Sequence, residues 1–189
     1  MPSAYGAKEN GICHHQATPS REGLDPPPQA ARPAPPPQAA RPAGSSPRAT
    51  IVVDVANVMG SRPDGWWRDR PGAAVRLHAE LAALAARGRP VLPDDTEPEE
   101  FIMVLEGATR AAAPRIKAAQ NKAAQNKAGA GVRVVQADGS GDDAIVALVR
   151  ELSGRRVVVT ADRELRRRCE AAGAEVFGPS WLIGLAREH

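Results

Sequence analysis

Carboxylates stand at or just after the ends of four apolar runs in this sequence. Asp54 closes "TIVVD", Glu106 closes "FIMVLE", Asp162 follows "VVVTA", and Asp142 and Asp143 lie in "GSGDDAIV" after the run "GVRVVQA". Carboxylates gathered in one place repel one another unless a cation lies among them. A set of oxygen ligands without His or Cys suits Mg²⁺ or Mn²⁺ rather than zinc. Such ions organise phosphoryl chemistry by activating water and neutralising the leaving oxygen.

Each of these acids also has an ordinary structural explanation. Ser140 and Asp143 are spaced like the two residues of a helix capping box. Asp162 is suited to cap the helix that follows it, and Glu106 is suited to pair with Arg110. The chemical interpretation rests on the four positions together, because consecutive crossovers of a parallel sheet would bring all of them to one edge.

A loop just past Asp54 combines cations with aromatic rings. Asn57 is placed to bond Asp54 or a metal-bound water, or to serve as a turn residue. The stretch "GSRPDGWWRDRPG" then supplies Arg62, Trp66, Trp67, Arg68 and Arg70. Aromatic faces stack on unpaired bases and arginines hold phosphates, so the loop is a candidate for binding single-stranded nucleic acid. The alternative is that the tryptophans pack on the domain and the arginines pair with Asp64 and Asp69.

Further along the chain, Arg163 and residues 166–168 form a basic run beside Asp162. Solvated helix faces often carry such runs, so the charge alone does not indicate a ligand. The repeat "AAQNKAAQNK" (118–127) is interpreted as a solvent-exposed extension of a helix, with an RNA-contacting arm as the alternative.

The elements that position the acids alternate along the chain. Continuous apolar runs predict strands over 50–55, 101–107, 131–137, 155–162 and 174–178. Helical periodicity predicts helices over 72–87, 110–128, 141–153, 163–172 and 179–189. Strands without polar alternation, separated by helices, predict a three-layer α/β sandwich around a mainly parallel sheet of about five strands. Ligands of such folds bind at the carboxyl edge of the strands, where the acids are expected.

The motifs "VVDVANV", "GSGDDAIV" and "VVVTADREL" resemble those of NYN domains, in the PIN-like nuclease superfamily. The resemblance runs from about residue 50 to 182 and implies a Rossmann-like α/β sandwich. Many NYN domains are metal-dependent ribonucleases, which implies Mg²⁺ or Mn²⁺ as cofactor and RNA as partner. The resemblance also implies a metal-binding core of Asp54, Asp142 or Asp143, and Asp162. Asn57 matches an asparagine common after the first aspartate, and Glu106 stands where many relatives carry an acid.

The first 49 residues have a different composition from the rest. They hold 11 of the 18 prolines, in runs such as "DPPPQAARPAPPPQAARPAG", and show no apolar periodicity. We therefore expect a disordered tail over 1–49 and one α/β domain over 50–189. The tail lacks the apolar core of a secretory signal, and no stretch approaches the length of a membrane span. We expect a cytoplasmic protein without membrane contact.

Net charge does not decide the function. Residues 1–49 hold five Lys/Arg and three Asp/Glu, and residues 50–189 hold twenty and nineteen, so the basic pI is not by itself a nucleic-acid signature.

The leading hypothesis is a metal-dependent ribonuclease that acts on single-stranded RNA. A nucleoside-triphosphate pyrophosphohydrolase would use the same acids on free nucleotides, but the helical type carries an E-E-x-x-E array, whereas "EPEE" (97–100) is expected in a loop. A non-catalytic PIN-like module that binds RNA or a protein partner is the third possibility. The sequence leaves the oligomeric state open.

Overall fold

The computed structural model describes residues 48–88, 91–125 and 131–187, all within the unit Arg41–His189. The predicted tail over 1–49 lies outside these residues, except for Arg48 and Ala49, which begin the first strand.

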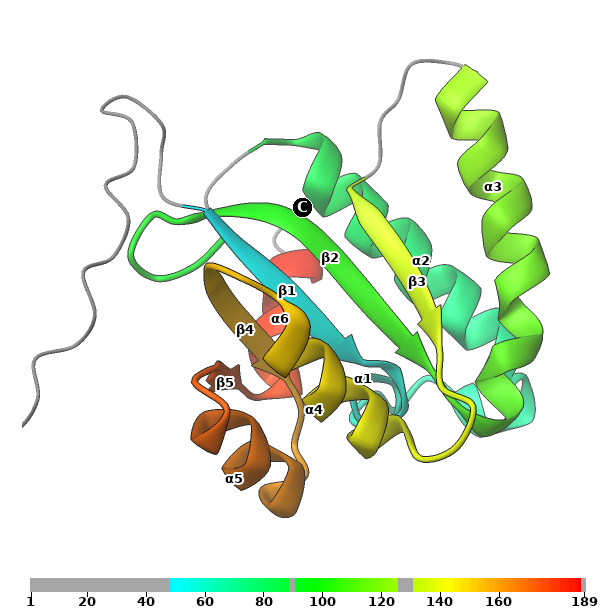
Figure 1. The fold of residues 1–189 in the computed structure, drawn as a ribbon. Helices are drawn as coiled ribbons and strands as arrows, with labels where there is room; N and C mark the ends of the chain where they lie inside the picture. The colour runs from blue at the N-terminus through cyan, green and yellow to red at the C-terminus, as the bar shows by residue number, and fades with distance from the viewer. Residues whose placement is uncertain (1–47, 89–90, 126–130, 188–189) are drawn as a thin grey trace, which may run out of the picture. The chain divides into compact units, whose positions relative to one another are not determined.

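The five described strands form one parallel sheet (Figure 1). They are β1 Arg48–Asp54, β2 Glu97–Leu105, β3 Val132–Gln136, β4 Arg155–Val159 and β5 Glu175–Phe177. Their order is β3-β2-β1-β4-β5, so β1 is central and the direction of winding reverses beside it. The predicted α/β fold with a parallel sheet is confirmed.

The start of β2 corrects one expectation. Residues 97–100 belong to the strand and not to a loop. Strand β3 joins β2 only from Phe101 onward, while β1 already pairs with Glu97 and Pro98. This part of β2 therefore has a neighbour on one side only, an edge position at which proline is tolerated.

The described residues also form six α-helices and two short 3₁₀ helices. The α-helices are α1 Val55–Gly60, α2 Arg70–Ala86, α3 Ala113–Gln125, α4 Gly141–Glu151, α5 Arg163–Ala171 and α6 Pro179–Arg187; the 3₁₀ helices are η1 Trp66–Arg68 and η2 Gly107–Ala112. Helix α1 was not predicted, because six residues give too short a periodic pattern. The predicted helix over 110–128 divides into η2 and α3, and its last residues lie outside the described part of the chain, as do residues 188 and 189.

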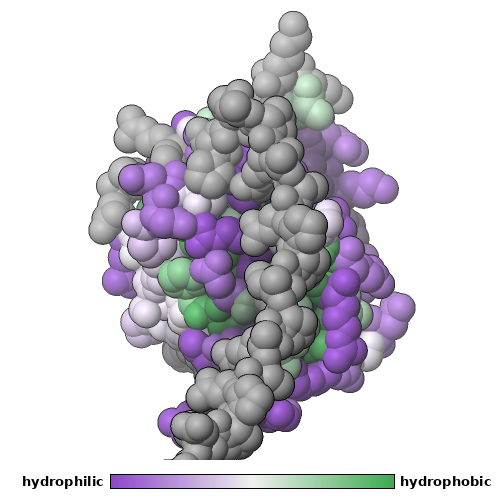
Figure 2. Space-filling model, turned by 60° about the vertical axis from the view of Figure 1, so that its left-hand side comes forward, coloured by the Kyte–Doolittle hydropathy of each residue, from purple (hydrophilic) through white to green (hydrophobic). Residues whose placement is uncertain are grey.

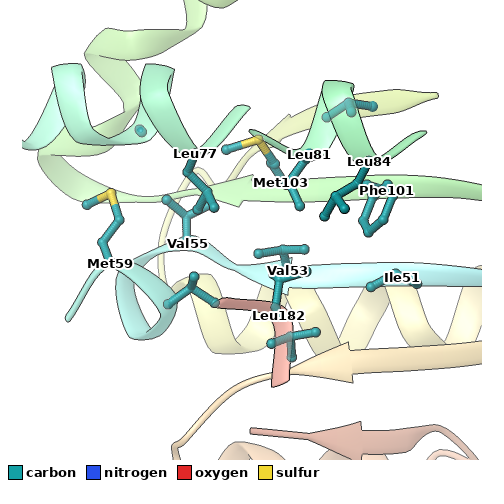
Figure 3. Packing of buried hydrophobic residues seen from close by; sticks show 14 of the residues in the cluster. Ile51, Val53, Val55, Met59, Leu77, Leu81, Leu84, Phe101, Met103 and Leu182 are labelled. Atoms are coloured by element: carbon teal, nitrogen blue, oxygen red, sulfur yellow. The ribbon is translucent and has the colours of Figure 1, made fainter. Parts of the chain in front are cut away.

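The alternation of side chains along β1 separates two cores. Ile51 and Val53 join the cluster that α1, α2, α3 and α6 cover, whereas Val52 joins the cluster under α4 and α5. Figure 3 shows the first cluster, in which Leu77 of α2 lies toward Met103 of β2. The sheet is therefore the middle of three layers (Figure 1).

The outer surface is largely polar where Figure 2 colours it, with a smaller apolar area between hydrophilic side chains. No helix in the described part of the chain combines the length and the apolar character needed to cross a bilayer.

Candidate functional site

Strand alternation brings three polar side chains to one corner of the sheet. Asp54 shares the face of Val52 and lies opposite Val104 of β2. Glu106 comes two residues after Val104, and Thr160 two residues after Val158, so both are expected on the face covered by α4 and α5. Because the strands are parallel, all three stand at the carboxyl edge, beside the reversal in strand order where such folds bind ligands.

Asp54 is held rigidly at this corner. Its carboxylate is buried, with 6% of the residue exposed. Oδ1 accepts a hydrogen bond from the Asn57 backbone N at 3.1 Å, which makes Asp54 the N-cap of α1. Oδ2 accepts from Asn57 Nδ2 at 2.7 Å and from Thr160 Oγ1 at 2.8 Å. Asn57 therefore bonds Asp54 directly, one of the roles that the sequence allowed.

Thr160 was missed by the sequence analysis. Its fully buried hydroxyl donates to Asp54 and accepts from the backbone N of Asp162 at 3.1 Å. The residue thus couples the ends of β1 and β4 through a single oxygen atom. The available signal was a polar residue at the strand parity of Val158, directly after three valines.

Asp162 caps α5, since its Oδ1 accepts from the Leu165 backbone N at 2.7 Å. This structural role, which the sequence allowed, is compatible with a second role, because each carboxylate oxygen has more than one acceptor site.

Glu106 is bonded to the start of α4. Its Oε2 accepts from the Gly141 backbone N at 2.7 Å. A Cβ atom at residue 141 would lie 2.5 Å from that oxygen, so a larger residue would require the Glu106 carboxylate to move. The alternative pairing with Arg110 is not formed; Arg110 donates from Nη1 to the carbonyl oxygen of Ala137 at 3.2 Å.

The two adjacent aspartates of α4 differ in their surroundings. Asp143 is exposed and forms an ion pair with Arg168 at 2.6 Å. The pKa of Asp142 is raised, first by burial and then by the charges of Asp54, Asp162 and Glu106, against a smaller lowering by Arg168. Asp142 therefore stands in the field of the other acids, whereas Asp143 is exposed and paired with Arg168.

The carboxylates repel one another at this edge. Burial is the main reason why the pKa of Asp54 is raised, and the charge of Glu106 adds to it, although hydrogen bonds from Asn57 and Thr160 oppose the shift. A cation among Asp54, Asp142 and their neighbours would relieve both desolvation and repulsion.

The donor chemistry fits a hard divalent ion, because it consists of carboxylate oxygens with a hydroxyl nearby. Among the described residues, no three His, Cys, Asp or Glu side chains are close enough to enclose a metal ion. Mg²⁺ does not require such an enclosure, since it typically keeps several waters and binds one or two carboxylates together with substrate phosphates. Asp54 and Asp142 are the pair that fits this pattern best.

The tryptophan loop combines both arrangements considered from the sequence. Trp66 is partly buried against the first core, while Trp67 is 56% exposed, the one large apolar side chain so exposed among the described residues. The two rings meet edge to face, with centroids 6.3 Å apart. The guanidinium carbon of Arg70 lies 5.4 Å from the centre of the Trp66 ring, and that of Arg68 lies 5.9 Å from the centre of Trp67.

Arg62 is engaged elsewhere. Its two terminal nitrogens bond both carboxylate oxygens of Glu80, at 2.9 and 2.6 Å. The pair lines an open hollow of about 350 Å³ together with Asp64 and the end of α6, and this hollow includes none of the acids described above. The alternative partners of the loop arginines bond the backbone, since Asp64 accepts from the backbone N of Trp66 and Asp69 caps α2.

No family model matches the chain, and no curated protein matches it significantly. Among solved structures, the chain is similar to a crystal structure of Rae1 (YacP) from Bacillus subtilis, a tryptophan-to-leucine mutant, with a TM-score of 0.51. The two chains are 16% identical over 74% of this chain and 76% of the other. This likeness shows a shared fold.

Proposed function

We propose that this protein is a metal-dependent nuclease that hydrolyses phosphodiester bonds in single-stranded RNA. The observation that carries the proposal is the gathering of buried and half-buried acids at the carboxyl edge, where burial and neighbouring acids raise the pKa of both Asp54 and Asp142. The shared fold and the resemblance of the motifs to NYN domains support the same conclusion.

In this proposal the residues have distinct roles. Asp54 and Asp142 would bind Mg²⁺ or Mn²⁺, with Asp162 and Glu106 contributing charge or bonds to bound water. Such an ion activates water for attack on phosphorus and neutralises the leaving oxygen. Asn57 and Thr160 keep the Asp54 carboxylate in one orientation, which is the usual task of groups around a metal ligand.

The RNA would be held by exposed side chains of the tryptophan loop and of α5. Trp67 offers its face to an unpaired base, and base stacking of this kind tolerates any sequence. Arg68 beside Trp67 and Arg163 at the start of α5 would hold phosphates. Trp66, which packs on the first core, and Arg70 beside it would keep the loop in position. Neither Arg62, paired with Glu80, nor Asp143 has a role in this proposal.

The test is cleavage of an end-labelled single-stranded RNA in the presence of Mn²⁺. The wild type should cut the RNA, and the Asp54→Asn, Asp162→Asn double variant should lose more than roughly 100-fold, the upper end of what second-shell changes cost. The Asp143→Asn variant is the matched control. It should retain activity within about threefold, because Asp143 is exposed and paired with Arg168.

Other outcomes contradict specific parts of the proposal. RNA binding without cleavage would indicate a non-catalytic RNA-binding module. Hydrolysis of free nucleoside triphosphates with intact RNA would indicate a nucleotide hydrolase. Equal cleavage by the wild type and the double variant would exclude the carboxylate site.

A further inference from the structure

The arginines of the described residues differ in how their charge is compensated. Seven of the seventeen form ion pairs with carboxylates; these are Arg48, Arg62, Arg133, Arg155, Arg166, Arg167 and Arg168. Arg110 is among the ten that form none within the described part of the chain. It is exposed, and within the described ranges no Asp or Glu lies within ion-pair distance of it.

Arg110 is nevertheless fixed in place. Its Nη1 donates to the carbonyl oxygen of Ala137 at 3.2 Å, and the backbone N of Ala137 in turn donates to the Leu105 carbonyl at 2.8 Å. The 3₁₀ helix that carries Arg110 is anchored by buried Thr109, whose hydroxyl bonds the backbone of Glu106. A neutral carbonyl leaves the full positive charge and four of the five N–H donors available.

The position of Arg110 relates it to the acids. It follows Glu106 by four residues and bridges the ends of β2 and β3, at the same edge of the sheet as Asp54. On the other side of β1, exposed Arg163 follows Asp162 after β4, and it too has no ion pair within the described part of the chain. Strands β2 and β4 are two strand spacings apart, or about 10 Å, so a cation flanks the acids on each side.

Further positive charge lies on α3, which runs back from this edge along the sheet (Figure 1). Helix α3 follows directly and contains Arg115, Lys117 and Lys122 but no Asp or Glu in residues 113–125. A polyanion that approaches four carboxylates is repelled by them, so cations on both sides are needed to hold it across the edge.

We propose that Arg110 binds a backbone phosphate of single-stranded RNA on the β3 side of the acids, while Arg163 binds the same RNA on the β4 side. The RNA then crosses the sheet edge at right angles to the strands. This inference rests on the proposed function and adds an anchoring residue and a direction for the substrate.

The test uses the full chain in the Asp54→Asn background, so that RNA is bound but not cut. The affinity for a fluorescently labelled single-stranded RNA is measured by anisotropy over a range of salt concentrations. Arg110→Gln should weaken binding roughly five- to tenfold and lower the slope of log K against log salt by about 0.7, the value for one lost phosphate contact on a single strand. Arg110→Lys should restore the slope because it keeps the charge.

Arg150→Gln is the matched control, because Arg150 is also exposed and without an ion pair among the described residues but lies in the last turn of α4, at the opposite edge. Equal effects of Arg110→Gln and Arg150→Gln would overturn the inference, while cleavage by the wild type would leave the proposed function standing. Weaker binding of RNA by Arg110→Gln with an unchanged salt slope would also overturn the inference, since this result would indicate a structural role for Arg110. A protein that neither binds nor cuts RNA would overturn both.

Discussion

The carboxyl group of Asp142 is subject to opposing effects. Its place in the first turn of α4 favours a negative charge, whereas burial and the charges of Asp54, Asp162 and Glu106 oppose it. The raised pKa indicates that the opposing effects dominate. Without a bound cation, the ionised carboxylate therefore lowers the free energy of unfolding.

We predict that Asp142→Asn raises the melting temperature of the metal-free protein at pH 7 by about 1–3 °C. The folded state takes up a proton at Asp142 more readily than the unfolded state, so the destabilisation is complete above the raised pKa. This destabilisation disappears as the pH falls through the raised pKa of Asp142 toward the ordinary pKa of 3.8. The gain should therefore shrink as the pH falls and vanish below 3.8, which calorimetry over this pH range can check.

Asp143→Asn provides the comparison, because that variant removes an ion pair with Arg168 and relieves no repulsion. It should not raise the melting temperature. A lower melting temperature for Asp142→Asn would mean that attraction to the N-terminus of α4 exceeds the repulsion. With Mn²⁺ added, the wild type should have a higher melting temperature than Asp142→Asn, since the wild type keeps the full set of acids.

Helix α4 is positioned by one close contact. Its first amide, on Gly141, is bonded to Glu106, which places Asp142 beside the ends of β1 and β2. A methyl group at residue 141 would overlap the Glu106 carboxylate. The position of the start of α4 and the position of the Glu106 carboxylate therefore depend on each other.

We predict that Gly141→Ala destabilises the protein by about 1–3 kcal/mol, because this overlap outweighs the gain in helix propensity of up to about 1 kcal/mol. Chemical denaturation measures the effect. Gly139→Ala is the control, since a Cβ at residue 139 meets no atom within 4 Å. In the Glu106→Ala background the cost of Gly141→Ala should largely disappear, and an unchanged cost would show that the contact with Glu106 is not its cause.

The sequence predicted the five strands and most of the helices because buried parallel strands and amphipathic helices leave strong periodic patterns. It also predicted which acids follow the strands. It could not separate Asp142 from Asp143, since neighbours in a first helical turn differ only in what the rest of the fold places beside them. Thr160 was missed for a similar reason, because its partner Asp54 is 106 residues away in the chain.

The two edges of the sheet have different chemistry. At the carboxyl edge, the charges of Asp54, Asp162 and Glu106 oppose ionisation of Asp142, and Arg168 offsets them only in part. At the opposite edge, Arg155 bonds Asp94 and Thr96 before β2 and Glu175 in β5, so one guanidinium joins the starts of three strands. The pKa of Arg155 is raised, chiefly by its hydrogen bonds to Glu175. The charges of Arg155, Asp94 and Glu175 are thus paired, as expected for a structural contact.

We predict that Arg155→Met lowers the melting temperature by about 2–4 °C and leaves RNA cleavage by the folded protein unchanged. Arg133→Met should cost less, because Arg133 pairs with Glu100 alone and its side chain is 44% exposed. Thermal unfolding and cleavage rates, measured well below both transitions, test the two statements separately. A loss of cleavage in folded Arg155→Met protein would contradict the separation, since it would mean that order at the starts of the strands is needed to align the carboxylates at their ends.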